Sequence, residues 1–274
     1  SLPNLATMLN KDYEVHYRGK WHLNKGGQNN VHPEKSLMRA DVALFGFEGW
    51  VPPDAGEDIK PENFGGGYAN HDEEYIQQAI DFIENYEAAR AAGKKNKPWC
   101  LVLSLVNPHD VLSYPSSYNF GYSDPKWFEG DIQLPESFSE SLYQNYKPAA
   151  QVQLKLAVST SLGLLEGKNA QVGHPEMYQN LNMEQRRELG ARHYLNFYGN
   201  LMREADRQIG RLLNLFYTSN NGGQAPTELA KETLILRISD HGELGMTHGG
   251  LRQKAFNVYQ ETIKIPIVLS NPVM

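Results

Sequence analysis

One continuous apolar run, from Trp99 to Val106, constrains the fold more than any other feature of the sequence. Its residues do not alternate between apolar and polar, which is typical of a strand buried on both faces of a parallel sheet. The run is far shorter than the ~20 residues that an apolar helix needs to cross a bilayer, so we expect no membrane span. A strand buried on both faces needs helices on both sides of its sheet, and we therefore expect an α/β fold.

Segments with helical and strand-like patterns alternate along the rest of the chain. The spacing of apolar residues predicts helices over 2–9, 72–92, about 151–165 and 183–217, the last ending in the Asn- and Gly-rich residues 220–223. Strands are predicted over 13–17, 99–106, 233–239 and 265–269, and Pro266 gives the last strand a start or edge position. Residues 24–70 and 107–180 lack periodicity outside that one helix and are predicted as loops. This order predicts a layered, mostly parallel sheet flanked by helices.

Charge and cysteine content narrow the possible functions. The chain has 26 basic and 32 acidic side chains, a net charge of −6 and no basic cluster, which disfavours nucleic acid as a partner. Cys100 is the single cysteine, so no internal disulfide can form, and its apolar neighbours favour a small hydrophobic side chain over a reactive thiol. The chain begins with Ser1 rather than Met and shows no signal peptide, so we expect a piece of a longer protein.

Three polar clusters each follow the end of a predicted strand. They are Gly19-Lys20-Trp21-His22, Asn107-Pro108-His109-Asp110 and Asp240-His241-Gly242-Glu243. In open α/β sheets, ligands bind at the carboxyl ends of the strands. If the strands are parallel, all three clusters face one crevice.

Each cluster also has an ordinary structural explanation. Lys20 and His22 project to the same side of an extended segment and could present two donors to one anion, or they could be a solvated lysine and a hydrogen-bonded core histidine. His109 follows Asn-Pro, a common turn initiator, and taken alone it is better explained as a turn residue. Asp240 and His241 could both coordinate a divalent cation, although an Asx-turn that closes the strand has the same pattern. Lys254 could pair with Glu261 or add a cation to the crevice.

Taken in order, these segments resemble the type I sulfatases of the alkaline phosphatase superfamily. The matching blocks are residues 19–23 (GKWHL, with Asn24 in place of the family's final glycine), 97–110 (ending in NPHD), 239–245 (SDHGELG), 248–254 (HGGLRQK) and 259–266 (YQETIKIP). The predicted helices over 72–92 and 183–217 fall between these blocks, as they do in the family. The resemblance covers nearly the whole chain except for the loops over 24–70 and 111–180.

The resemblance implies a role for each matching residue. Asp240 and His241 would be ligands of a divalent cation, most often calcium in this family, with magnesium or manganese as alternatives. Calcium prefers oxygen ligands, so the histidine leaves the identity of the metal open. Lys20 and Lys254 would neutralise the sulfate ester oxygens. His22 would orient the nucleophile, and His109 would contact the leaving oxygen as a general acid.

The sequence lacks the family's nucleophile segment, a C/S-x-P-x-R motif whose Cys or Ser becomes formylglycine, and the early Asp-Asp pair of metal ligands. We therefore expect residues 1–274 to be the central and C-terminal part of one sulfatase-like catalytic domain, inactive in isolation. The expected substrate is a small-molecule or carbohydrate sulfate ester, and the family suggests a periplasmic or secreted location. Two alternatives remain: a phosphonate monoester hydrolase or phosphodiesterase of the same superfamily, and an inert anion-binding module.

Overall fold

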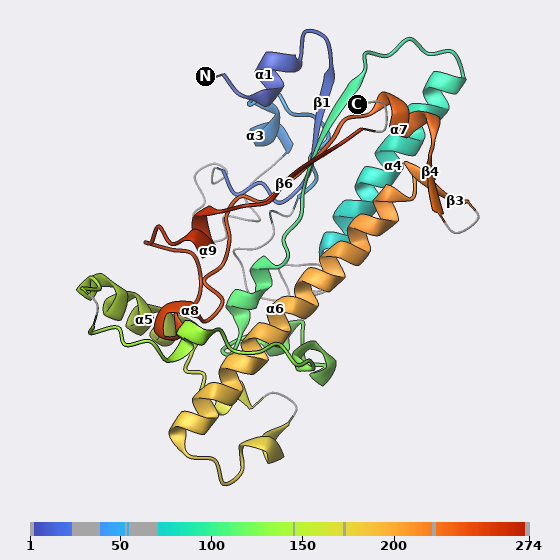
Figure 1. Cartoon of the computed structure of the whole chain (residues 1–274). Coiled ribbons are helices and arrows are strands. Elements are labelled where there is room, and N and C mark those ends of the chain that lie inside the picture. Colours follow the sequence, from blue (N-terminus) through green and yellow to red (C-terminus); the bar gives the residue numbers. More distant parts are fainter. Residues whose placement is uncertain are drawn as a thin grey trace. The chain divides into compact units, whose positions relative to one another are not determined.

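The computed structural model describes residues 3–23, 39–52, 54, 71–144, 146–171, 174–220 and 223–271. The chain divides into two compact units (Figure 1). Unit 1 comprises Ser1–His109 and Glu204–Leu215, and unit 2 comprises Asp110–Arg203 and Phe216–Met274. None of the helices in the described ranges is both long and apolar enough to cross a membrane.

Unit 1 is built on two parallel strands, β1 (Glu14–Gly19) and β2 (Trp99–Ser104), which pair in register from Glu14↔Trp99 to Gly19↔Ser104. Alternate residues of β1 are buried, as expected of a strand with one face on a core. The core on that face is aromatic: the Tyr17, Trp21 and Phe47 rings meet edge to face at centroid distances of 5.1–5.7 Å.

In the part of unit 1 that the structure describes, helices α1 (Leu5–Leu9), α3 (Arg39–Ala43) and α4 (His71–Ala91) accompany this pair of strands. Helix α1 starts with a capping box, in which the Asn4 side chain accepts from Thr7 N and the Thr7 side chain accepts from Asn4 N. Helix α4 buries Tyr75, Ile76, Ala79 and Ile83, which are spaced along one face. It contacts both strands and is the crossover between them.

Unit 2 is mostly helical and irregular. Its long helices are α5 (Ala149–Leu162) and the larger part of α6 (Met183–Leu213), which continues into unit 1. Short 3₁₀ turns η3 to η8 interrupt the irregular segments between residues 109 and 178 (His109–Ser113, Tyr118–Phe120, Pro125–Phe128, Glu136–Ser139, Lys168–Ala170, Pro175–Tyr178). Buried rings of this unit pack against one another, among them those of Tyr114, Tyr122, Phe128, Tyr194 and Phe197.

The C-terminal part of unit 2 contains short elements. These are β3 (Tyr217–Asn220), β4 (Gly223–Pro226), α7 (Glu228–Glu232), β5 (Ile235–Ile238), α8 (Thr247–Gly250), α9 (Gln260–Ile263) and β6 (Ile267–Ser270). Strand β3 forms a hairpin with β4, and β5 pairs antiparallel with β6. The position predicted for β6 after Pro266 is confirmed, because the strand starts at the next residue.

The alternation of helices and strands confirms the α/β class, but three details of the prediction were wrong. The long helix ends at Leu213 rather than 217, because residues 217–220 form strand β3, which pairs with β4, instead of continuing the helix. Strands β5 and β6 are antiparallel rather than parallel. Strand β2 is half-buried throughout rather than buried on both faces, because among the described residues it pairs only with β1. The described strands form three separate two-stranded sheets.

Candidate active-site segments

The first candidate segment leaves β1 at Gly19, whose backbone has a φ of +93°. A Cβ atom at this position would lie 2.0 Å from the Ser104 carbonyl oxygen on β2, so only glycine fits. Lys20 N then donates to the same Ser104 oxygen at 2.9 Å. The chain therefore turns away at the carboxyl end of the parallel pair and places Lys20 and His22 there.

A buried carboxylate holds this segment in place. Asp54 accepts hydrogen bonds from Trp21 N at 2.6 Å and from His22 N at 2.7 Å. Burial raises the pKa of Asp54, while the two N–H donors and the nearby Lys20 and His22 charges oppose the rise. The Tyr17 hydroxyl adds a hydrogen bond to the Lys20 carbonyl at 2.6 Å. The backbone from residue 20 to residue 22 is thus fixed by groups on other segments.

The second candidate segment leaves β2 and is held in the same way. Asp72, in the first turn of α4, accepts from Val106 N at 2.6 Å and from Asn107 N at 3.0 Å, and only 3% of it is exposed. His109 N donates to the Val106 carbonyl at 3.1 Å, which places His109 directly after the held peptide groups. Since β1 and β2 are parallel, His109 lies at the same edge of the pair as Lys20 and His22.

The third candidate segment follows β5 in unit 2. Asp240 is largely exposed, and its Oδ2 atom lies 3.3 Å from Nε2 of His241. His241 Nδ1 lies 2.8 Å from the Gly242 carbonyl oxygen. A carbonyl only accepts hydrogen bonds, so Nδ1 is the ring nitrogen that the backbone engages, and Nε2 is the nitrogen beside the aspartate.

This arrangement fits part of a divalent cation site. A carboxylate oxygen and an imidazole nitrogen lie 3.3 Å apart, and the backbone orients the imidazole ring through its other nitrogen. The two residues supply two donors, fewer than the six to eight that calcium takes. Over the described ranges, no group of three or more His, Cys, Asp and Glu side chains is arranged to hold a metal.

Glu243 organises the segment that carries Lys254. Its Oε1 atom accepts from Gln253 N at 2.7 Å, from Gly245 N at 3.2 Å and from the Tyr194 hydroxyl at 2.7 Å. Burial and the Glu243 charge raise the pKa of Tyr194 well above its ordinary value, so the phenol stays a donor. Lys254 follows Gln253 directly and is half-buried.

Glu261 is bound differently from the pairing considered for it. Its Oε1 atom lies 3.3 Å from Nε2 of His248, whose ring stacks on Tyr259 at a centroid distance of 3.8 Å and an angle of 14°. The Glu261 carbonyl also packs against Gly242, where a Cβ atom would lie 1.9 Å from it. These contacts place α9 against the loop that follows Asp240.

The predicted residues thus fall into two groups. Lys20, His22 and His109 share one strand edge in unit 1, as predicted. Asp240, His241 and Lys254 lie in unit 2, all within the stretch from β5 to α9. The single crevice expected to hold both groups stays a prediction.

Some residues that hold these segments were missed from the sequence. Asp54 lies 32 residues from His22, inside a predicted loop, so no local pattern points to its role. Asp72 lies in the first turn of α4 and its side chain binds the backbone that follows β2, a contact that helical periodicity does not reveal. Aromatic side chains of the two predicted loops mostly belong to the core, as their size favours: Trp50, Tyr114 and Phe128 are 0–2% exposed, while Tyr68 lies outside the described residues.

Cys100 is confirmed as a hydrophobic side chain. It packs against the aromatic core cluster of unit 1. Burial raises the pKa of its thiol, which disfavours the reactive thiolate.

Comparison with known proteins identifies relatives. A protein-family model described as Sulfatase matches residues 1–273. A solved structure of a candidate sulfatase from Bacteroides thetaiotaomicron VPI-5482 aligns with a TM-score of 0.51 at 17% identity, and it covers 99% of this chain and 47% of that one. A second structure, of BT4656 in complex with its substrate D-glucosamine-2-N,6-O-disulfate, has a TM-score of 0.49 at 19% identity, with 97% and 54% covered. Among proteins of curated function, none matches the sequence. The chain therefore spans about half the length of the structures that it resembles.

Proposed function

Because the chain belongs to the sulfatase family, we propose that it is part of an enzyme that hydrolyses sulfate monoesters with the help of a divalent cation. The observation that carries the proposal, beside the family, is the pair of strand-end segments in unit 1. Two buried carboxylates, Asp54 and Asp72, fix the backbone there, so that Lys20, His22 and His109 share one edge. A site that stabilises a transition state needs groups whose positions are fixed before the reaction.

The chemistry of sulfate ester cleavage assigns a task to each of these side chains. Negative charge builds up on the nonbridging and leaving oxygens, and the Lys20 and Lys254 ammonium groups would offset it. His109 would donate a proton to the leaving oxygen as the S–O bond breaks. His22 would hold the nucleophile in line with the sulfur.

Asp240 and His241 are the proposed metal ligands. The position of His241 Nε2 beside the Asp240 carboxylate, with Nδ1 on the Gly242 carbonyl, supports this role. A bound divalent cation would supply Lewis-acid stabilisation of the sulfate oxygens. Calcium is the proposed ion, with magnesium or manganese as alternatives, and further ligands would have to come from other segments.

We further propose that this chain forms the central and C-terminal part of the catalytic domain, within an alkaline-phosphatase-like layered sheet to which β1 and β2 belong. The family nucleophile, a formylglycine, would then be contributed by residues outside this sequence. Two facts support this: the C/S-x-P-x-R motif is absent from the sequence, and the chain covers 47% of the structure that it resembles at a TM-score of 0.51.

The proposal is tested by mutating Lys20 and Asp240 in the protein expressed from its complete reading frame. Lys20→Ala and Asp240→Asn are each expected to lower kcat/KM for an aryl sulfate by about a hundredfold or more, with melting temperatures close to that of the wild type. Lys94→Ala and Asp131→Asn alter exposed residues of unit 1 and unit 2 and serve as matched controls. Full activity in both site variants, or a loss of folding that explains the lost turnover, would refute these roles.

A further inference from the structure

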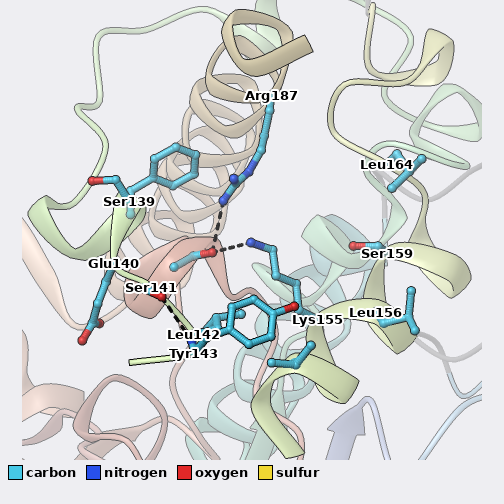
Figure 2. Close-up of a pocket in the computed structure, with 13 residues that line it drawn as sticks. Ser139, Glu140, Ser141, Leu142, Tyr143, Lys155, Leu156, Ser159, Leu164 and Arg187 are labelled. Atoms are coloured by element: carbon cyan, nitrogen blue, oxygen red, sulfur yellow. Dashed lines mark hydrogen bonds between the residues drawn. The ribbon is translucent and has the colours of Figure 1, made fainter. Parts of the chain in front are cut away.

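Unit 2 contains a pocket that the proposed sulfatase site does not use (Figure 2). It has a volume of about 430 Å³ and lies between η6, α5, α6 and α8. Small-molecule pockets in proteins are typically of this size, on the order of 300–1,000 Å³. Leu142, Val152 and Leu164 give it apolar walls. The pocket could therefore hold a compact organic molecule.

Two cationic side chains converge in this pocket from neighbouring helices. Lys155 of α5 donates from Nζ to the Gly249 carbonyl oxygen at 2.5 Å, and Arg187 of α6 donates from Nη2 to the same oxygen at 3.1 Å (Figure 2). The Arg187 guanidinium also lies over the Phe138 ring, 4.9 Å from its centroid. The shared oxygen has two lone pairs and uses both, while each cation keeps further N–H donors for a ligand.

Within the described parts of the chain, neither cation has a carboxylate within ion-pair distance. Glu140 lines the pocket, but its carboxylate is bound to Lys147 at 2.7 Å and lies 3.3 Å from His248, and Figure 2 shows it directed away from the two cations. Burial and the Arg187 charge lower the pKa of Lys155 to about 8, against a smaller opposite effect of Glu166. Two half-buried like charges without a carboxylate at ion-pair distance are unfavourable, and a bound anion would stabilise both.

We propose that this pocket binds an organic anion whose oxyanion group, a sulfate, sulfonate or carboxylate, lies between Lys155 and Arg187. Its apolar body would pack on Leu142, Val152 and Leu164. The geometry that carries the proposal is the convergence of two cations on one carbonyl at the edge of an apolar cavity. This binding site is separate from the residues assigned to sulfate ester cleavage.

The test is calorimetric titration at pH 7 of the protein with naphthalene-2-sulfonate, uncharged 2-naphthalenemethanol and inorganic sulfate. We expect one sulfonate per chain at this site, with the alcohol and inorganic sulfate each bound at least about tenfold more weakly, because each lacks one half of the interaction. Lys155→Met and Arg187→Gln should each weaken sulfonate binding by about tenfold or more. Lys155→Arg keeps the charge and should retain binding.

Two controls separate this pocket from other binding. Lys168→Met changes an exposed lysine outside the pocket and should leave sulfonate binding unchanged. Lys254→Gln should also leave it unchanged, because Lys254 belongs to the proposed sulfate site. Equal binding of the alcohol or of inorganic sulfate would overturn the proposal. So would binding that survives Lys155→Met and Arg187→Gln, or binding that is lost in Lys254→Gln.

Discussion

Replacing Asp72 tests whether a buried carboxylate sets the position of the His109 segment. Both of its oxygens accept backbone N–H groups, at 2.6 Å from Val106 and 3.0 Å from Asn107, and the residue is 3% exposed. Leaving a buried donor without a partner costs about 1–3 kcal/mol, and two donors lose their partner in Asp72→Ala. The carboxylate also lies in the first turn of α4, where a negative charge contributes about 0.3–1 kcal/mol.

The expected loss of unfolding free energy for Asp72→Ala is therefore about 2–7 kcal/mol, measured by urea unfolding. Asp72→Asn keeps one accepting oxygen and should lose about half of that. Glu84→Gln, an exposed change on the same helix, should stay within about 0.5 kcal/mol of the wild type. If Asp72→Ala matched this control, the carboxylate would not hold the segment, and the fixed position of His109 would lose its explanation.

Three further substitutions have defined outcomes. Burial lowers the pKa of His193 from 6.5 to about 4, so between these pH values the unfolded chain binds a proton that the folded chain does not. The free energy of unfolding should therefore fall by up to about 3 kcal/mol as the pH drops from 6.5 to 4. Urea unfolding of His193→Gln over this pH range should not show that fall. Gly242→Ala places a Cβ atom 1.9 Å from the Glu261 carbonyl oxygen and should lower the melting temperature. Gly210→Ala should maintain or raise it, because a Cβ atom there would have no other atom within 4 Å. Equal melting temperatures of the two variants would contradict the close contact between Gly242 and Glu261. In the complete enzyme, His109→Ala should slow substrates with poor leaving groups most, and an equal loss across a series of aryl sulfates would remove its role as an acid.

Local patterns in the sequence predicted the elements that have strong local signals. Helix α4 was predicted within one residue at each end, because Tyr75, Ile76, Ala79 and Ile83 form a continuous buried face and Gly93 with its positive φ lies just beyond its end. The β3–β4 hairpin was missed because its strands are only four residues each and follow a long helix without a clear break. The antiparallel direction of β6 depends on the path of the whole loop from 239 to 266, which no local periodicity encodes.

The candidate site was predictable to a similar degree. Motif blocks and strand ends located Lys20, His22 and His109, and the structure places all three at one strand edge. The side chains that hold them could not be inferred in the same way, because Asp54 and Asp72 act on peptide groups 32 to 35 residues away along the chain. The Lys155–Arg187 pocket likewise depends on how α5 and α6 approach α8, which follows from packing alone.

The central claim, hydrolysis of sulfate monoesters, is tested most directly by comparing two substrates with the same leaving group. The protein from its complete reading frame, with calcium present, is assayed side by side on 4-nitrophenyl sulfate and 4-nitrophenyl phosphate, together with its Asp240→Asn variant. We predict release of 4-nitrophenol from the sulfate with the higher kcat/KM, and loss of that release in the variant. Preferential cleavage of the phosphate, or no cleavage of either ester by the wild type, would contradict the assignment.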